Sequence, residues 1–210
     1  MRKIYLFACL SLFVVLCSGQ MKEKSKILDS GKIENNTYFN SFFNFKMVLP
    51  YNWILQSQNE IEDTFIEGAN TVLGGNSSLK STAEAAIAES AVLVSLYNSD
   101  IETNGMIRVI VYNVKNFPKI KTGNDYLFYT RQLFEQYPID ATFSESSRET
   151  IDGIVFYKMN ISVKYPEFDL EMEEICYSTV LNNYCFNIMG TYIYDDQKNE
   201  ILKSIRSVKF

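Results

Sequence analysis

Hydrophobic and polar residues alternate along much of the chain with the two-residue period of a β-strand. In residues 43–49 every second side chain is large and apolar, and these are Phe43, Phe45, Met47 and Leu49. Such alternation predicts a strand with one buried face, and Pro50 should end it because proline has no amide hydrogen to donate. Two further apolar runs, residues 91–98 and 106–114, predict a pair of strands joined by a turn.

The spacing becomes helical in residues 123–138. Side chains that would share one side of a helix recur there at intervals of three and four, and they are Leu127, Thr130, Phe134 and Tyr137. Asn124 is expected to cap the first turn and Pro138 to end the helix. Near the C-terminus Asp195 or Asp196 can cap a second helix, which a short terminal strand should follow.

Between the two helices the pattern predicts two hairpins, the first with its turn at residues 166–167. A short turn centred there pairs residues whose numbers sum to about 333. Val163 would then face Leu170, and Ile161 would face Met172, so that apolar side chains meet across the pair. This register is what a half-buried antiparallel pair should show.

The second hairpin is expected to turn at Asn182 and Asn183, because both residues tolerate positive φ. That turn pairs residues whose numbers sum to 365. Its large apolar residues have the opposite parity from those of the first hairpin. We therefore expect a bulge near Glu173 or Glu174, which would bring both sets to one face of the sheet.

The segment from residue 60 to residue 90 differs from the rest of the chain. Three glycines are followed by the alanine-rich stretch STAEAAIAESA, in which Ser81 or Thr82 can begin a helix whose small side chains would pack weakly. We expect a loosely docked excursion that serves as a lid or contact loop. Within it, GGNSSLKST resembles a phosphate-binding loop, but Leu79 replaces the glycine before the lysine, which argues against nucleotide binding.

The N-terminal residues have the features of a signal peptide. Arg2 and Lys3 precede a short apolar core, and polar residues end it before it is long enough to span a bilayer, so residues 1–19 are assigned to export. Cys17 is a candidate lipid attachment site. Alternatively, ordinary cleavage would leave Gln20 as the new N-terminus of a secreted or periplasmic protein. Residues 20–37 are predicted to form a flexible tether, and residues 38–210 a single domain of about the usual size.

Composition removes many classes of function. The chain has no histidine, which excludes Ser-His-Asp and Cys-His catalysis and every metal site that needs imidazole. Without residues 1–19, 18 basic and 25 acidic side chains remain, a net charge of −7. This balance argues against nucleic acid as a partner, because phosphate binding needs a surplus of Lys and Arg on one face.

Candidate metal and thiol chemistry is also weak. Glu167, Asp169, Glu171 and Glu173 would share one strand face, but neighbours on a strand face lie about 7 Å apart, too far for one ion to gather several of them. The register of the second hairpin offsets Cys176 and Cys185 by four residues, roughly 13 Å along the strand. A disulfide needs Cα atoms within about 7 Å, so both thiols are predicted to be free. We expect no cofactor and no metal.

The order of the elements resembles that of the PsbP-like family of small exported domains, which includes bacterial lipoproteins of the DcrB type. The resemblance spans residues 38–210, and its most recognisable positions are Pro50, Trp53, Ser207 and Phe210. It implies an α+β fold in which a twisted antiparallel sheet carries helices on its faces. It does not imply an enzyme, because characterised relatives mostly act as binding or assembly partners. No functional residue of the family maps onto this chain.

The sequence therefore favours a non-enzymatic, extracytoplasmic binding or accessory domain. It would be anchored to the cell envelope through Cys17 and contact a protein partner through a sheet edge or through residues 60–90. The alternative is a small-ligand or lipid binder with a pocket near that segment. A hydrolase that uses a pair of carboxylates is a third hypothesis, although no spacing singles out a pair.

Overall fold

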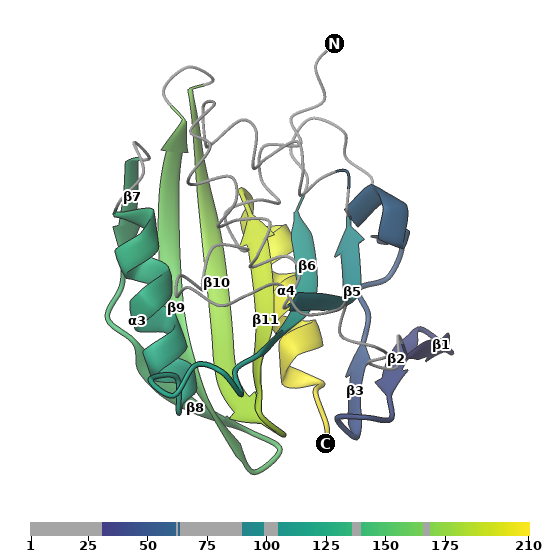
Figure 1. The fold of residues 1–210 in the computed structure, drawn as a ribbon. Helices are drawn as coiled ribbons and strands as arrows, with labels where there is room; N and C mark the ends of the chain where they lie inside the picture. Colours follow the sequence, from purple (N-terminus) through teal and green to yellow (C-terminus); the bar gives the residue numbers. More distant parts are fainter. Residues whose placement is uncertain (1–30, 62, 64–89, 99–104, 136–139, 166–168) are drawn as a thin grey trace.

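A computed structural model describes residues 31–61, 63, 90–98, 105–135, 140–165 and 169–210. Eight strands form one antiparallel sheet in the order β4-β5-β6-β11-β10-β9-β7, with β8 also paired to β9 (Figure 1). Their bounds are β4 Ile54–Leu55, β5 Ser90–Tyr97, β6 Met106–Asn113, β7 Asp140–Phe143, β8 Ser147–Ile151, β9 Ile154–Tyr165, β10 Leu170–Leu181 and β11 Tyr184–Tyr192. The predicted strands at 91–98 and 106–114 are thus confirmed.

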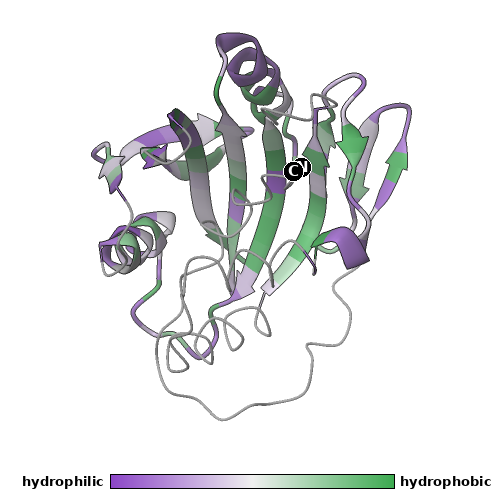
Figure 2. Ribbon diagram, turned by 90° about the horizontal axis from the view of Figure 1, so that it is seen from above, coloured by the Kyte–Doolittle hydropathy of each residue, from purple (hydrophilic) through white to green (hydrophobic). Residues whose placement is uncertain are grey.

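Two helices cover opposite faces of this sheet. Helix α3 (Gly123–Phe134) packs mainly on β9 and β10, and helix α4 (Asp195–Arg206) packs on β11 from the other side (Figure 1). Figure 2, seen from above, separates the two helices clearly and shows hydrophobic residues concentrated in the strands between them. The predicted α+β fold, an antiparallel sheet with helices on its faces, is confirmed.

The expected bulge in β10 is absent, because both faces of the sheet are buried. Strand β10 pairs without interruption with β9 and with β11. Met172 and Cys176 pack into the core under α3, whereas Ile175 and Tyr177 pack into the core under α4. Apolar residues of both parities are therefore buried without any irregularity, and the prediction failed because it assumed one solvated face.

The register of the first hairpin is shifted by two residues from the prediction. Residues of β9 and β10 pair when their numbers sum to 335, so Val163 faces Met172 and Ile161 faces Glu174. The connection spans residues 166–169, twice the length that was assumed. A shift of two residues keeps every side chain on its predicted face, so the apolar and polar sides were assigned correctly.

The second hairpin has the predicted register. Asn182 and Asn183 adopt φ of 51° and 65°, and the paired residues of β10 and β11 sum to 365. Both turn residues have positive φ, which matches the twist of the flanking strands. Cys176 and Cys185 are buried and unbridged, as this register predicts.

The residue that caps α3 is Thr122 rather than the predicted Asn124. The Asp125 amide donates to Thr122 Oγ1 (3.3 Å), while Asp125 Oδ2 accepts the Thr122 amide hydrogen (2.8 Å). This reciprocal pair satisfies amides that a helix start leaves without partners. Asn124 instead accepts a hydrogen bond from Ser146, and Pro138, the predicted stop, lies outside the described residues. The predicted inward face is confirmed where it is described, since Leu127, Thr130 and Phe134 are buried.

Helix α4 begins at Asp195, so neither aspartate is its cap. Gln197 Oε1 accepts the amide hydrogens of Ile193 and Tyr194 and closes the first turn. Ile201 and Ile205 point into the core, as predicted. The terminal strand is reduced to a single bridge between Lys46 and Lys209.

A second, three-stranded sheet packs beside α4 in the order β1-β2-β3, with β1 Lys32–Glu34, β2 Thr37–Asn40 and β3 Phe45–Val48. The predicted strand at 43–49 is confirmed in β3, whose inward residues are buried. The predicted tether, residues 20–37, is too long, because residues 32–37 already belong to the β1–β2 hairpin. Strand β1 was not predicted because all of its side chains are exposed, so the sequence shows no alternation of apolar and polar residues there. Except for residues 60, 61, 63 and 90, the predicted 60–90 excursion lies outside the described residues.

Candidate functional site

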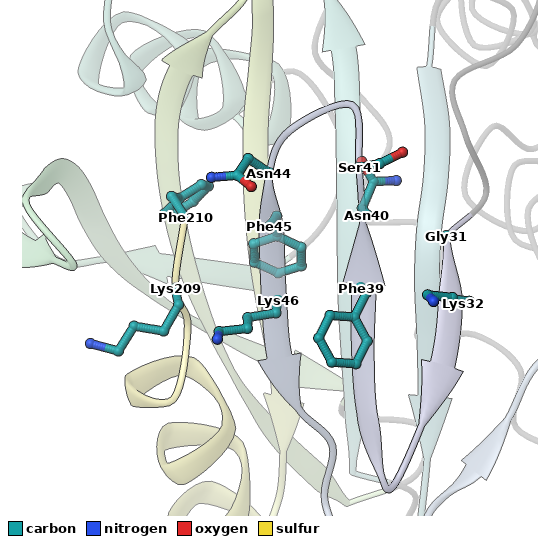
Figure 3. A pocket seen from close by; sticks show the side chains of 10 residues that line it. All are labelled: Gly31, Lys32, Phe39, Asn40, Ser41, Asn44, Phe45, Lys46, Lys209 and Phe210. Carbon is teal, nitrogen blue, oxygen red and sulfur yellow. The ribbon is translucent and has the colours of Figure 1, made fainter.

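An open pocket of about 570 Å³ lies where the small sheet meets the C-terminal residues (Figure 3). Strands β1, β2 and β3 each contribute to its lining, which consists of Gly31, Lys32, Phe39, Asn40, Ser41, Asn44, Phe45, Lys46, Lys209 and Phe210. The lining contains lysines, phenylalanines and small polar residues but no Asp or Glu. It therefore offers no carboxylate pair for the hydrolase hypothesis.

The pairing of the strands places four lining residues in one row. Lys32 pairs with Phe39, Phe39 with Lys46, and Lys46 with Lys209. Directly paired residues share a face of an antiparallel sheet, and in Figure 3 the four side chains lie side by side across the strands. We call Lys32, Phe39, Lys46 and Lys209 the lysine row.

Two of the three lysines have acidic partners. Lys32 Nζ lies 2.9 Å from Glu34 Oε1, and Lys209 Nζ lies 3.0 Å from Asp152 Oδ1. The pKa of Asp152 is below its ordinary value because the Phe210 amide donates to the carboxylate and because Lys209 lies beside it. Within the described part of the chain, Lys46 has no ion-pair partner. The row therefore keeps a surplus of positive charge.

Aromatic packing makes the floor of the pocket rigid. The ring of Phe45 lies 5.6 Å from that of Phe210 and 5.0 Å from that of Phe186, between ring centroids. These tilted and edge-to-face contacts are those that aromatic rings prefer. At the rim, Gly31 has φ of 73°, and a Cβ there would lie 2.4 Å from the carbonyl oxygen of Phe39. The chain therefore enters the domain at the pocket, at a position that requires glycine.

The segment from the end of β3 through β4 exposes several large apolar side chains. Four of them lie within residues 48–55, and we call this set the apolar edge: Val48 (45% exposed), Tyr51 (77%), Ile54 (43%) and Leu55 (49%). Ile54 and Leu55 form β4, the terminal strand of the large sheet, which pairs with β5. Trp53 Nε1 donates to Glu200 Oε2 at 2.6 Å and so attaches the segment to α4.

The sheet face under α3 contains most of the buried polar residues of the large sheet. Seven buried polar residues lie on the strands of the large sheet, and six of them point to this face: Ser95, Arg108, Glu174, Ser178, Asn187 and Thr191. Arg108 donates from Nε to Ser95 Oγ (3.0 Å) and from Nη2 to Gln56 Oε1 (3.2 Å). These bonds compensate part of the cost of burying its charge.

Glu174 is the least satisfied group on this face. Its side chain is buried, and its Oε1 has no hydrogen-bond partner among the described residues. Burial raises the pKa of Glu174 to about 7, although the positive charge of Arg108 opposes the increase. The sequence named Glu174 only as a possible bulge position, because the predicted acidic face consists of the residues of opposite parity, Glu167, Asp169, Glu171 and Glu173.

Cys176 and Cys185 do not form a reactive site. Burial raises the pKa of both thiols, and Cys185 Sγ lies 3.3 Å from Ser178 Oγ. A thiol is nucleophilic only as the thiolate, which burial disfavours. Both residues therefore fill space in the core.

The remaining predicted sites are the lipid attachment site, the glycine-rich loop and the acidic strand. Cys17, the candidate lipid attachment site, and the loop at 74–82 lie outside the described residues, as does Glu167. On the acidic strand Glu171 accepts a hydrogen bond from Ser162 (2.7 Å). No group of three His, Cys, Asp or Glu residues that could hold a metal ion occurs in the described ranges. Nor does a described helix have the length and apolarity needed to cross a membrane.

Comparison with known proteins shows a similarity of fold. No family model matches the chain, and no curated protein matches it. The solution structure of cyanobacterial PsbP (CyanoP) from Synechocystis superposes with a TM-score of 0.51, covering 93% of this chain and 97% of that chain. The chain has a PsbP-like fold. At 16% sequence identity, the similarity concerns the fold alone, and a PsbP-like fold assigns no function by itself.

Proposed function

We propose that this protein is a non-enzymatic, extracytoplasmic binding domain, held at the cell envelope by a lipid on Cys17, that contacts a protein partner through the apolar edge. The observation that carries the proposal is the clustering of exposed apolar side chains. Nine large hydrophobic side chains are exposed among the described residues, and four of them lie within the eight residues 48–55. Exposed apolar residues scattered singly are normal, whereas four of them within one eight-residue segment support an interaction site there.

The position of this cluster on a terminal strand strengthens the argument. Strand β4 ends the large sheet, and the opposite terminal strand, β7, has the sequence DATF, with two of its residues exposed. Proteins usually protect terminal strands with charge or with very short length, because unpaired backbone groups attract other chains. At β4 the strand is short but its side chains are apolar. A partner that adds a strand or an apolar surface there would bury them.

Packing against a partner would gain substantial free energy at this edge. Fully burying a large aliphatic side chain that starts exposed stabilises by about 1.5 to 3 kcal/mol. The aliphatic side chains of the apolar edge are about half exposed, so each would gain about half of that value. Tyr51 combines an apolar ring with a hydroxyl that suits a partly polar interface. Trp53, fixed to α4 through Glu200, holds the backbone of the segment in place. A preorganised surface loses less entropy on binding.

Site-specific photo-crosslinking in the native host tests this proposal. A photoreactive phenylalanine analogue at position 51 should give a discrete crosslinked product with one envelope protein, identified by mass spectrometry. Phe128 provides the matched control, since it is also an exposed aromatic residue, at 55%, and lies on α3. The same analogue at position 128 should not give that product. Absence of a product at position 51, or equal products at both positions, would overturn the proposal.

The proposed lipid anchor is tested separately. Intact mass spectrometry of the full mature protein from its host should show a chain that begins at Cys17 and carries acyl groups. A chain that begins at Gln20 without added mass would refute the anchor, whatever the outcome of the crosslinking.

The buried polar face supports a second candidate function, the binding of a small ligand. Glu174 has an unsatisfied carboxyl oxygen on the same sheet face as Arg108, and a ligand with polar groups would satisfy it. Native mass spectrometry of the protein from its host should then show a bound small molecule that is lost in Glu174→Ala. If the measured mass equals that of the processed chain alone, the small-ligand hypothesis is wrong.

A further inference from the structure

We propose that the lysine row is a membrane-facing surface that binds the headgroups of anionic lipids and orients the domain on the bilayer. The proposal concerns a surface other than the apolar edge, and it rests on the proposed anchor at Cys17. Four observations support it: the charge of the row, the pairing of its lysines, the place where the chain enters the domain, and the aromatic residue within the row.

The charge of the lysine row contrasts with that of the rest of the protein. The chain without its signal peptide has 18 basic and 25 acidic side chains, a net charge of −7. Around the row, three lysine side chains stand beside two acidic side chains, Glu34 and Asp152. An anionic membrane surface repels a negatively charged domain in most orientations. The lysine row is a face that such a surface attracts.

Two lysines of the row are directly paired, an arrangement that costs stability. A binding role for the surface would explain why both are present. Lys46 and Lys209 are cross-strand partners, joined by hydrogen bonds between their backbone amides and carbonyls (2.9 and 3.0 Å). Like charges directly opposite one another destabilise an antiparallel pair. Lys209 forms an ion pair with Asp152, and Lys46 interacts with the same carboxylate from farther away, so that one carboxylate serves both lysines. A lipid phosphate lying between the two ammonium groups would remove the repulsion.

The chain enters the domain at this same face. Gly31 and Lys32, which line the pocket, follow the segment that leads back to Cys17. Thirteen residues lie between Cys17 and Gly31, so fourteen Cα–Cα steps join the two. If these residues form the predicted flexible tether, the two ends lie about 20 Å apart on average, and even a fully extended chain reaches no more than about 50 Å. A lipid on Cys17 would therefore keep the lysine row close to the membrane surface.

The side chains of the row suit the interface between headgroups and water. Each ammonium group is a compact donor that binds phosphate as a point charge, and its flexible stem can lie along apolar surface while the charge stays solvated. Phe39 lies between Lys32 and Lys46 in the row and is partly exposed. Aromatic rings next to basic residues are typical of surfaces that rest on membranes. One lysine near an anionic leaflet increases membrane partitioning by roughly fivefold. The lysine row alone would therefore bind weakly, and the lipid anchor is needed to hold it at the membrane surface.

Lysine footprinting on vesicles tests the proposal with the whole mature chain. A chain of residues 17–210 is coupled through Cys17 to a maleimide lipid, and Cys176 and Cys185 stay unreacted because both are fully buried. The vesicles contain either phosphatidylcholine alone or phosphatidylcholine mixed with phosphatidylglycerol. Acetylation of each lysine is then followed by mass spectrometry.

On anionic vesicles we expect Lys32, Lys46 and Lys209 to be acetylated several-fold more slowly than on neutral vesicles, and high salt should abolish the difference. Lys164 is the control, because it is exposed and is the second-last residue of β9, a strand whose end lies far from the small sheet in Figure 1. It should react equally on both kinds of vesicle. Lys46→Gln should reduce the protection of Lys32 and Lys209, whereas Lys164→Gln should not. Thermal unfolding of both variants verifies that they fold.

Equal acetylation of the row on both kinds of vesicle would overturn the proposal. Protection that arises on native membranes but not on protein-free anionic vesicles would assign the row to a protein partner, and would also overturn it. Because coupling in vitro replaces lipidation by the cell, these results do not depend on whether Cys17 is lipidated in the host. Failure of the lysine row and failure of the anchor are thus separate outcomes.

Discussion

Glu174 is a buried carboxyl group whose replacement by glutamine removes a charge and keeps nearly the same shape. In the folded protein the pKa of this carboxyl is about 7, against an ordinary value of 4.5, because burial penalises the charged form and Arg108 compensates only in part. At neutral pH the protein therefore holds a poorly compensated negative charge in its core. We predict that Glu174→Gln stabilises the fold, and that the gain depends on pH.

The size and sign of the effect follow from the two pKa values. Each unit of difference between the folded-state and the ordinary pKa corresponds to about 1.4 kcal/mol of unfolding free energy. For Glu174, whose pKa rises from 4.5 to about 7, the total is about 3 kcal/mol. Because the folded-state pKa is the higher one, the contribution of Glu174 to stability is fully present below pH 4.5 and is lost as the pH rises through about 7. The variant has no such group. It should match the wild type at about pH 4.5 and exceed it by about 3 kcal/mol at about pH 8.

Urea denaturation at a series of pH values measures this difference directly. The difference in unfolding free energy between Glu174→Gln and the wild type should grow from near zero to its full value over the interval between the two pKa values. Glu171→Gln is the control, since it removes an exposed carboxyl from the same strand and should show no comparable trend. If Glu174→Gln were less stable than the wild type at about pH 8, Glu174 would be ionised and stabilised by Arg108, and the reasoning would be wrong.

Three further predictions concern the cap, the packing of α4 and the buried thiols. Thr122→Ala should lower the unfolding free energy by about 1 kcal/mol because it removes the cap of α3, and urea denaturation should show a smaller loss for Asn124→Ala. Gly190→Ala should destabilise by about 1 to 3 kcal/mol, since its Cβ would lie 2.3 Å from a side chain of α4; an unchanged melting temperature would contradict that packing. Cys176 and Cys185 should resist a thiol-specific reagent in the native protein and react with it in urea; rapid native labelling would show that the core opens.

Strand alternation and the tight turn, which neighbouring residues set, were predicted correctly from the sequence, although the caps of α3 and α4 were not. The alternation in residues 43–49 placed the inward face of β3 correctly, because the period of two is a property of the extended backbone itself. Asn182 and Asn183 determined the register of the β10–β11 hairpin, since a tight turn of two residues leaves one pairing. From that register the absence of a bridge between the two cysteines followed.

Predictions that depended on distant packing failed. The bulge in β10 was expected because the burial of a second face, under α4, cannot be read from one strand. The register of the β9–β10 hairpin was two residues off because the length of the connection was underestimated. Strand β1 was assigned to the tether because its side chains are exposed and its pairing with β2 leaves no apolar pattern.

The candidate sites also divide into those that the sequence alone identifies and those that only the tertiary structure reveals. The candidate anchor at Cys17 and the absence of histidine chemistry are properties of the sequence alone, because they depend on local order and on composition. The lysine row joins residues from β1, β2, β3 and the C-terminus, which are up to 177 positions apart (Lys32 to Lys209). Similarly, Glu174 and Arg108 share a face because β11 lies between their strands. The sequence determines which side chains alternate and where turns form, since these depend on local backbone geometry. The tertiary structure decides which charges meet, because strand order brings together residues that no local pattern connects.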